Sequence, residues 1–455
     1  MIRPELSRED LLIVNTEAYV ALEKSREGRV DPLTAKSHSD HWAHELYVYT
    51  LADIARGNVE QAQEMFDFWL ERITPEGRVP HLIVDTTSLR RRFIDGPIVE
   101  KAKKLENGAM ATPHSGIPMM SMTALAIAEA LPEGSTRESW VQKVLPGLEK
   151  IKLWQYQERD MYRDGLIVQT HPDETFFRHG TGNKEALERL KESKLSRLEE
   201  KTRNNQFVQN VARLYLQLKG GGKVLRRGDS TYDAGQYMSL RTAAKLYGAK
   251  DDFRLQDVAV NGVMIADNQA IEELYAIAGK TIPDHLKINF MKTRSSLNKL
   301  WDEESGAFVS RLPQSNELLA GHMGAEPYIA LLGRAAMSTE QFNLTLSALE
   351  RDTVARNFPV STGHEDGLIH RGAMHPMVNF LMFNALESDI ERERNLKQAI
   401  GESVVQAYLA SKKGKNGHGK FSEGYNSVTG TPIGASYWGP TAAANVIFCR
   451  ALLDQ

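Results

Sequence analysis

The chain has 455 residues, of which 41% are hydrophobic and 25% are charged, and its formal net charge is −3. This composition is typical of a globular protein with a large core. The near balance of 56 basic and 59 acidic residues gives no support for nucleic acid as the main partner. The sequence contains no run of 18 apolar residues, so it predicts no membrane helix. The single cysteine, Cys449, excludes an internal disulfide framework, and together with an N-terminal segment that lacks a signal-peptide pattern it predicts a cytoplasmic protein.

Helical periodicity dominates the chain, with apolar residues at three- and four-residue spacing. The first predicted pair of helices spans 45–55 and 59–70, with Arg56-Gly57-Asn58 as the break between them. The same arrangement is predicted at 119–130 with 140–154, at 233–246 with 256–278, at 325–332 with 338–349 and at 375–386 with 391–409, before a closing helix from Thr441. Repeated pairs of this kind indicate helical hairpins arranged in a ring or superhelix, with little sheet.

Long loops separate these pairs. They cover 31–44, 75–118, 158–182, 220–232, 303–323, 358–374 and 414–440, and they are rich in Gly, Pro, His and aromatic residues. Loops of this length in a compact domain are usually functional or disordered, and the aromatic and His content favours ordered, functional loops. The densely charged stretch 183–203 has Glu and Lys at helical spacing and is interpreted as a solvated helix.

Five loop segments carry the residues that suggest chemistry: 38–45, 159–175, 227–233, 369–376 and 421–440. In the last of these, Glu423 lies in a Gly-rich turn between aromatic residues, where the backbone can approach a ligand closely and flat apolar faces are available to stack on a sugar. Asp160 and Asp164 are interpreted as turn formers, and Asp229 as a helix cap.

Cofactor and metal signatures are weak. The sequence contains no phosphate-binding loop, no dinucleotide-binding fingerprint and no pair of neighbouring cysteines. His41 and His44 are three residues apart and could share a helix face, but no second pair of ligands accompanies them, so we expect no metal and no cofactor.

Short motifs follow one another through these loops. They are Trp42-Ala43-His44-Glu45; Pro80-His81; Thr112-Pro113-His114; Arg159-Asp160, then Asp164-Gly165-Leu166 and His171-Pro172-Asp173-Glu174-Thr175; Ile369-His370-Arg371-Gly372-Ala373-Met374-His375-Pro376; and finally Glu423, Tyr425, Thr429-Gly430, Gly434 and Trp438.

In this order the motifs resemble those of the (α/α)6-barrel glycosidases related to mannosylglycerate and glucosylglycerate hydrolases and to the processing α-glucosidases of glycoside hydrolase family 63. The corresponding family segments read Trp-x-Trp-Asp, Pro-His, Gln-Pro-Pro, Arg-Asp with Asp-Gly-Leu and His-Pro-Trp-Glu-Ser, Tyr-Trp-Arg-Gly-Pro-x-Trp-Pro, and Glu-x-Tyr with Thr-Gly, Gly and Trp. The similarity extends from about residue 38 to the end. It implies an all-α fold, the (α/α)6 toroid, with a single catalytic domain over 1–455.

The resemblance also implies that Glu423 is the general base of a glycosidase. Such enzymes need a second carboxyl group to protonate the leaving oxygen. The family places this acid, an Asp, a few residues after His-Pro-Trp-Glu-Ser, but here the matching run 176–180 has no carboxylate. Either Asp173 or Glu174 supplies the proton, or the acid comes from another loop, or the chemistry has changed.

The leading hypothesis is therefore an inverting, exo-acting glycosidase that acts on a small α-linked sugar substrate. Several family Trp positions are His or smaller here, which favours an acidic substrate that His and Arg side chains bind. The predicted substrate-binding residues are Trp42, His44, Glu45, His81, His114, His171, His370, Arg371, Tyr425 and Trp438.

Two alternatives stay open. A lyase or epimerase acting on a uronate-type sugar would remove the proton next to a carboxylate with a His or Tyr base, and its activity would depend on His171, His179 or His370. A non-catalytic sugar-binding relative would bind the sugar without turnover.

Overall fold

The computed structural model describes residues 6–26, 41–84, 103–104, 110–112, 114–177, 183, 185–186, 253–319, 324–355, 373–412, 421–427, 429–433 and 438–454. Helices make up most of this part of the chain, and its strands have only two or three residues each. This confirms the prediction of an all-α protein with little sheet.

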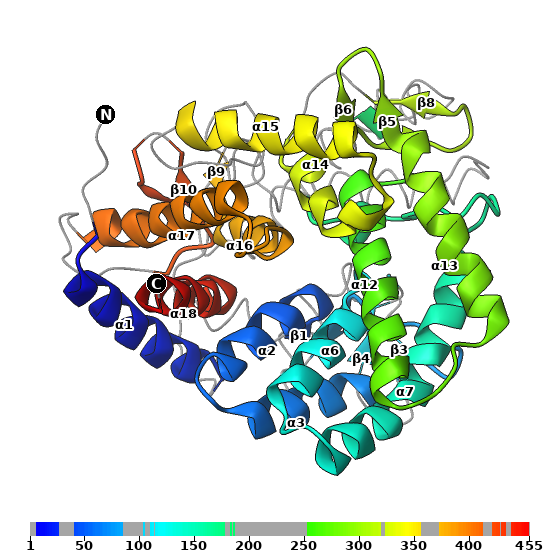
Figure 1. Cartoon of the computed structure of the whole chain (residues 1–455), viewed down its shortest axis with the longest axis horizontal. Coiled ribbons are helices and arrows are strands. Elements are labelled where there is room, and N and C mark those ends of the chain that lie inside the picture. Colours follow the sequence, from blue (N-terminus) through cyan, green and yellow to red (C-terminus); the bar gives the residue numbers. More distant parts are fainter. Residues whose placement is uncertain are drawn as a thin grey trace, which may run out of the picture.

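Six helical elements form a closed inner ring (Figure 1). In chain order they are α2 (Leu46–Ile54), α6 (Met120–Ala130), α12 (Val258–Ile277), α14 (Glu326–Ile329) with the 3-10 helix η6 (Ala330–Ala336), α16 (Pro376–Ala385) and α18 (Gly439–Leu453). Each packs against the next, and α18 packs against α2, which closes the ring. These helices are apolar around most of their circumference because neighbours cover them on nearly every side.

Each inner element has an outer partner. The outer helices are α1 (Arg8–Arg26), α3 (Val59–Leu70), α7 (Ser135–Trp154), α13 (Asp284–Ser296), α15 (Thr339–Ala355) and α17 (Glu391–Lys412). Five outer helices follow their inner partners in the sequence, whereas α1 packs on α18, so that the two ends of the chain form the sixth hairpin (Figure 1). The arrangement is the predicted (α/α)6 toroid.

Most predicted helices are confirmed, and the differences have local causes. α7 begins at Ser135, earlier than predicted. The first turn of this helix is polar, so the apolar spacing used for the prediction did not reveal it. The segment predicted as one helix at 325–332 is a short α-helix that continues as a 3-10 helix with a kink at Gly333. Neither α1 nor α13 was predicted, because exposed apolar residues such as Ile13 and Ile288 blur their amphipathic pattern. The helix predicted at 233–246 lies outside the described residues, and so does nearly all of 183–203.

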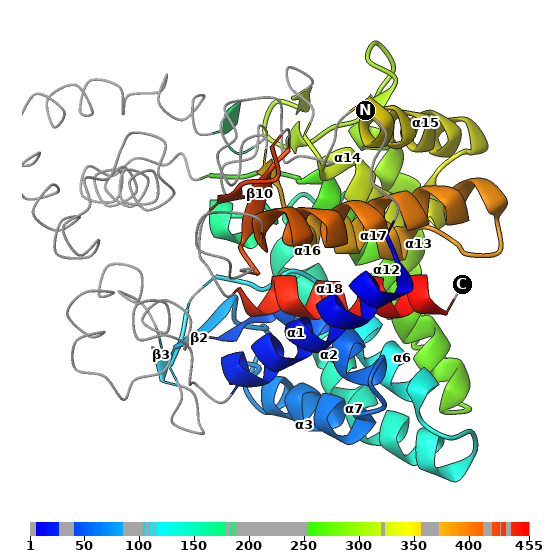
Figure 2. The same cartoon turned by 90° about the vertical axis from the view of Figure 1, so that its left-hand side faces the viewer.

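Strands gather at the end of the ring where the inner helices begin (Figure 2). One antiparallel sheet has the order β1 (His41–Trp42), β2 (Leu82–Val84), β4 (Met110–Ala111), β3 (Lys103–Lys104), and a second has the order β11 (Pro432–Ile433), β10 (Gly424–Asn426), β9 (Ala373–Met374). Two hairpins, β5 (Trp301–Asp302) with β6 (Ala307–Phe308) and β7 (Arg311–Leu312) with β8 (Glu317–Leu318), lie between α13 and α14. The loops that carry the predicted motifs are thus fixed to one another by short ladders.

A buried ion pair crosses the helical layers. Nζ of Lys152, on α7, lies 2.6 Å from a carboxylate oxygen of Asp267, on α12, and both side chains are 0% exposed. The second oxygen of Asp267 accepts a hydrogen bond of 2.8 Å from the backbone N–H of Met122, on α6. A buried charge requires such partners, so the pair fixes three helices relative to one another.

Two inner elements approach each other through glycine. A Cβ atom placed on Gly262, on α12, would lie 2.5 Å from Cα of Ala330, and one on Gly333 would lie 2.8 Å from the carbonyl oxygen of Gly262. Real Cβ atoms do not come so close to backbone, so glycine is required at this crossing. In the described part of the chain, no helix is long and apolar enough to span a membrane.

Candidate active site

The predicted site residues converge on the end of the ring where the inner helices start. The predicted residues His44 and Glu45 stand just before α2, and Trp438 stands just before α18. His375, which was not among the predicted site residues, stands just before α16. Helix N-termini carry unpaired N–H groups and partial positive charge, so this end of the ring favours anionic or hydroxyl-rich ligands.

One cluster of rings is built by the pairing of β1 with β2, in which Trp42 lies opposite Leu82. The ring centroid of His81 lies 4.9 Å from that of Trp42 and 5.7 Å from that of His44. His375 joins them: burial, followed by the nearby charge of His44, lowers its pKa from 6.5 to about 4. His375 is therefore a neutral imidazole at neutral pH.

A second cluster is a pair of stacked imidazoles. The ring centroids of His114 and His171 are 3.8 Å apart, with an interplanar angle of 23°. His171 caps the short 3-10 turn Pro172–Glu174, because its Nδ1 accepts a hydrogen bond of 3.1 Å from the backbone N–H of Asp173. A carboxylate oxygen of Asp173 lies 3.6 Å from the same nitrogen, and its side chain is 16% exposed.

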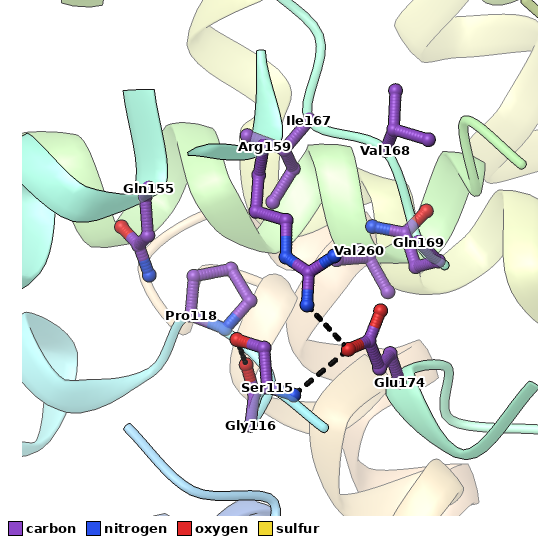
Figure 3. A pocket seen from close by; sticks show the side chains of 10 residues that line it. All are labelled: Ser115, Gly116, Pro118, Gln155, Arg159, Ile167, Val168, Gln169, Glu174 and Val260. Atoms are coloured by element: carbon purple, nitrogen blue, oxygen red, sulfur yellow. Dashed lines mark hydrogen bonds and ion pairs between the residues drawn. The ribbon is translucent and has the colours of Figure 1, made fainter. Parts of the chain in front are cut away.

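Glu174 is held more tightly than its neighbour Asp173. It is 4% exposed and contacts Arg159, whose Nη2 donates a hydrogen bond of 2.6 Å to Oε1. Figure 3 shows Arg159 pointing at this carboxylate across a small cavity that Gln155, Gln169 and Val260 also line. Arg159 comes from a π-helical turn, Gln155–Arg159, that ends α7. Irregular helical turns of this kind are frequent at functional sites.

Glu423 directly precedes β10, which pairs with β9 on one side and with β11 on the other. Its side chain is partly buried. The turn around it is fixed by Thr441, at the start of α18, whose hydroxyl donates a hydrogen bond of 2.8 Å to the carbonyl of Ser422. Tyr425 is fully buried, and its hydroxyl accepts a hydrogen bond from the backbone N–H of Ser422. Tyr425 therefore supports the turn that carries Glu423, and its predicted contact with substrate stays a prediction.

Other predicted residues fall into two groups. Asp160 is the turn former that the sequence indicated, because its carboxylate accepts hydrogen bonds from the backbone N–H groups of Asp164 and Gly165. Asp164 is engaged with Arg311 and Gln256. His370, Arg371, His179 and the segment 227–233 lie outside the described residues.

Two buried carboxyl groups at this end of the ring were not predicted from the sequence. Asp257 caps α12 by accepting a hydrogen bond of 2.8 Å from the N–H of Val260, and burial raises its pKa to about 6. Glu326 begins α14, and burial, with a smaller contribution from the charge of Asp257, raises its pKa to about 8. Asp257 was detectable as an acidic residue directly before an apolar helix, whereas no local signal distinguishes Glu326. Within the described ranges, no group of three or more His, Cys, Asp or Glu side chains is arranged to hold a metal ion.

Comparisons with known proteins agree with this geometry. A mannosylglycerate hydrolase from Thermus thermophilus is 26% identical over 253 residues, which cover 52% of this chain and 54% of the relative, so the match spans about half the length of that protein. The crystal structure of a GH63 mannosylglycerate hydrolase from another strain of Thermus thermophilus, in complex with Tris and D-glycerate, superposes with a TM-score of 0.73 at 18% identity, covering 95% of this chain and 99% of that one.

A more distant structure shares the fold. The neutral trehalase Nth1 from Saccharomyces cerevisiae superposes with a TM-score of 0.57 at 13% identity, covering 91% of this chain and 73% of that one. At this identity the likeness concerns the fold alone. The family model for the mannosylglycerate hydrolase MGH1-like glycoside hydrolase domain matches residues 39–441. The chain therefore belongs to the family of MGH1-like glycoside hydrolases.

Proposed function

We propose that the protein is an inverting, exo-acting glycoside hydrolase with a single catalytic domain and with Glu423 as its general base. The observation that carries this proposal is the position of Glu423 on a strand-anchored turn between the starts of α16 and α18. A general base must be held firmly and still reach solvent, because it activates a water molecule. The partly buried side chain of Glu423 meets both requirements.

Asp173 is the better candidate for the general acid. Both oxygens of Glu174 are occupied by hydrogen bonds to the protein, whereas the carboxylate of Asp173 is partly exposed beside Nδ1 of His171. A general acid must reach the leaving oxygen of the substrate, and of the two carboxyl groups only that of Asp173 is left accessible by its contacts with the protein. Asp173 would pass a proton to the oxygen of the departing group while Glu423 takes one from water.

The substrate we propose is a small α-linked glycoside that carries an acidic group. His44 stands where the family motif has Trp, His81 lies beside it, and His114 stacks on His171 close to Asp173. Imidazoles and the positive ends of the inner helices favour a carboxylate. The related crystal structure from Thermus thermophilus contains D-glycerate, which is a small hydroxy acid of this class.

Proton NMR of the purified protein with glycosylglycerates, small α-glucosides and short uronate oligomers tests the proposal. We expect a new anomeric signal of inverted configuration. In Glu423→Gln the turnover should fall by about 10² to 10⁴-fold, which is the usual contribution of a positioned base, with an unchanged fold. Glu304→Gln, which alters an exposed carboxylate in the turn of another hairpin, is the matched control. Full activity of Glu423→Gln would refute the assignment.

A lyase or epimerase is the second candidate, and the ring cluster favours it. The reaction needs an uncharged imidazole or a Tyr side chain within reach of the proton next to a carboxylate, and His44, His81 and Trp42 form a cluster of rings in which such a group is available. The same spectra separate the two reactions, since elimination produces a vinylic signal and hydrolysis does not. Shifts of substrate signals without any product would instead support a sugar-binding protein.

A further inference from the structure

Glu174 uses both of its oxygens to join three segments of the chain. Oε1 accepts hydrogen bonds from the backbone N–H of Ser115, at 2.8 Å, and from Nη2 of Arg159, at 2.6 Å. Oε2 accepts hydrogen bonds from the backbone N–H of Thr170, at 2.7 Å, and from its hydroxyl, at 3.2 Å. These donors lie up to 59 residues away in the sequence, so the contacts hold loops that are otherwise independent.

Two of the donor residues are the sequence neighbours of the two stacked imidazoles. Ser115 follows His114, and Thr170 precedes His171. The peptide between His114 and Ser115 is held from its other side as well, because its carbonyl oxygen accepts hydrogen bonds from Nη1 of Arg78, at 3.0 Å, and from the backbone N–H of His81, at 2.9 Å. One carboxylate therefore sets the backbone beside both rings.

Arg159 completes the arrangement. Its Nη2 donates to Glu174 (Figure 3). Its Nη1 donates a hydrogen bond of 2.7 Å to the hydroxyl of Thr170, and its guanidinium lies 5.2 Å from the ring centroid of Trp154. The planar fork of Arg satisfies two partners at a fixed angle, which the single ammonium group of Lys does not reproduce. The contact with Trp154 ties the fork to α7.

We propose that Glu174 and Arg159 are a positioning pair that fixes His114 against His171. In this role Glu174 donates no proton during the reaction, although the sequence offered it as a candidate acid. It keeps the two imidazoles, and through His171 also Asp173, in the orientation that the substrate meets. The inference rests on the proposed function only in so far as these imidazoles contact the substrate.

The consequence of breaking the pair follows from hydrogen bonding. In Glu174→Gln one oxygen is replaced by an NH2 group, which faces donors at Ser115, Arg159 or Thr170 whichever way the amide turns. Two donors without an acceptor repel each other, and the loops must separate to relieve this. A displacement of about 1 Å in an active site costs on the order of 100-fold in rate.

The experiment compares Glu174→Gln and Arg159→Lys with the wild type and with Glu158→Gln, which makes the same change at an exposed carboxylate beside Arg159. The first readout is independent of catalysis: the nuclear Overhauser cross-peak between the two imidazoles in protein that carries isotope-labelled histidine. The cross-peak is assigned with His114→Gln. We expect it in the wild type and in Glu158→Gln, and we expect its loss in Glu174→Gln. Arg159→Lys keeps the positive charge beside Glu174 but not the planar fork, and it is the second test of the pair if Glu174→Gln does not fold.

The second readout is kinetic, on whichever substrate the wild type turns over. We expect kcat/KM to fall about 100-fold in Glu174→Gln, with an unchanged pH profile, because no proton donor has been removed. Loss of the alkaline limb of the pH profile, where a general acid loses its proton, would instead make Glu174 the general acid and overturn the proposal. An unchanged cross-peak in both Glu174→Gln and Arg159→Lys would also overturn it. If the protein turns over no substrate, the proposed function fails, but the cross-peak still decides the role of Glu174.

Discussion

Glu326 provides the sharpest test of the electrostatics at this end of the ring. Its side chain is at the first residue of α14, it is 8% exposed, and its Oε2 has no hydrogen-bond partner in the described part of the chain. Burial, followed by the charge of Asp257, raises its pKa from 4.5 to about 8. Glu326 is therefore protonated in the folded protein at neutral pH, and ionised in the unfolded chain.

The sign of the pH dependence follows from proton counting. Between pH 4.5 and about pH 8 the folded state binds the proton of Glu326 and the unfolded state does not, so the free energy of unfolding falls as the pH rises. Each pH unit corresponds to about 1.4 kcal/mol, so the full window corresponds to a loss on the order of 5 kcal/mol. The stabilising contribution is complete below pH 4.5 and is lost above the folded pKa.

Glu326→Gln removes this dependence because Gln has a similar shape and no charge. Guanidinium chloride unfolding, followed by circular dichroism between about pH 5 and pH 8, gives the free energy of unfolding of wild type and variant at each pH. We expect the free energy of unfolding of the variant, relative to that of the wild type, to rise by about 1 kcal/mol per pH unit across this range. Glu340→Gln, at an exposed site in the first turn of α15, is the control and should run parallel to the wild type. A difference between Glu326→Gln and wild type that does not change with pH would refute the reasoning.

Two further changes test the packing of the ring by denaturant unfolding. Lys152→Met leaves the carboxylate of Asp267 buried without its cation, so we expect the free energy of unfolding to fall by about 3 to 5 kcal/mol. A fall of less than about 1 kcal/mol would mean that the ion pair does not stabilise the ring. Gly262→Ala places a methyl group 2.5 Å from Cα of Ala330 and should cost about 1 to 3 kcal/mol. The control is Gly401→Ala, whose Cβ would meet nothing closer than 3.6 Å. This change should be neutral or slightly stabilising because alanine is the better helix former. Equal effects on the free energy of unfolding at both glycines would contradict the close-approach argument.

Local patterns in the sequence determined most of the secondary structure. Apolar residues located α2, α3, α6 and α12 to within a few residues. The outer helix α3 shows its buried face as a period of three to four, whereas the inner helices stand out as largely apolar segments of helical length. The same reading grouped the long loops as the place for chemistry, since hairpins of helices leave their connections at the ends of the ring. The turn that carries Glu423 was also visible, as a carboxylate among glycines and aromatic residues.

Only the tertiary structure decided how the ring closes and what each carboxyl group does. No local signal in the chain pairs α1 with α18, because that contact joins the two ends of the chain. Asp173 and Glu174 are adjacent in the sequence and equivalent as candidates, but Glu174 faces donors from distant loops whereas Asp173 faces His171. The protonation of Glu326 likewise depends on burial and on Asp257, which stands at the start of a different helix. Desolvation and hydrogen bonding are properties of the packed molecule, and the residue type alone does not specify them.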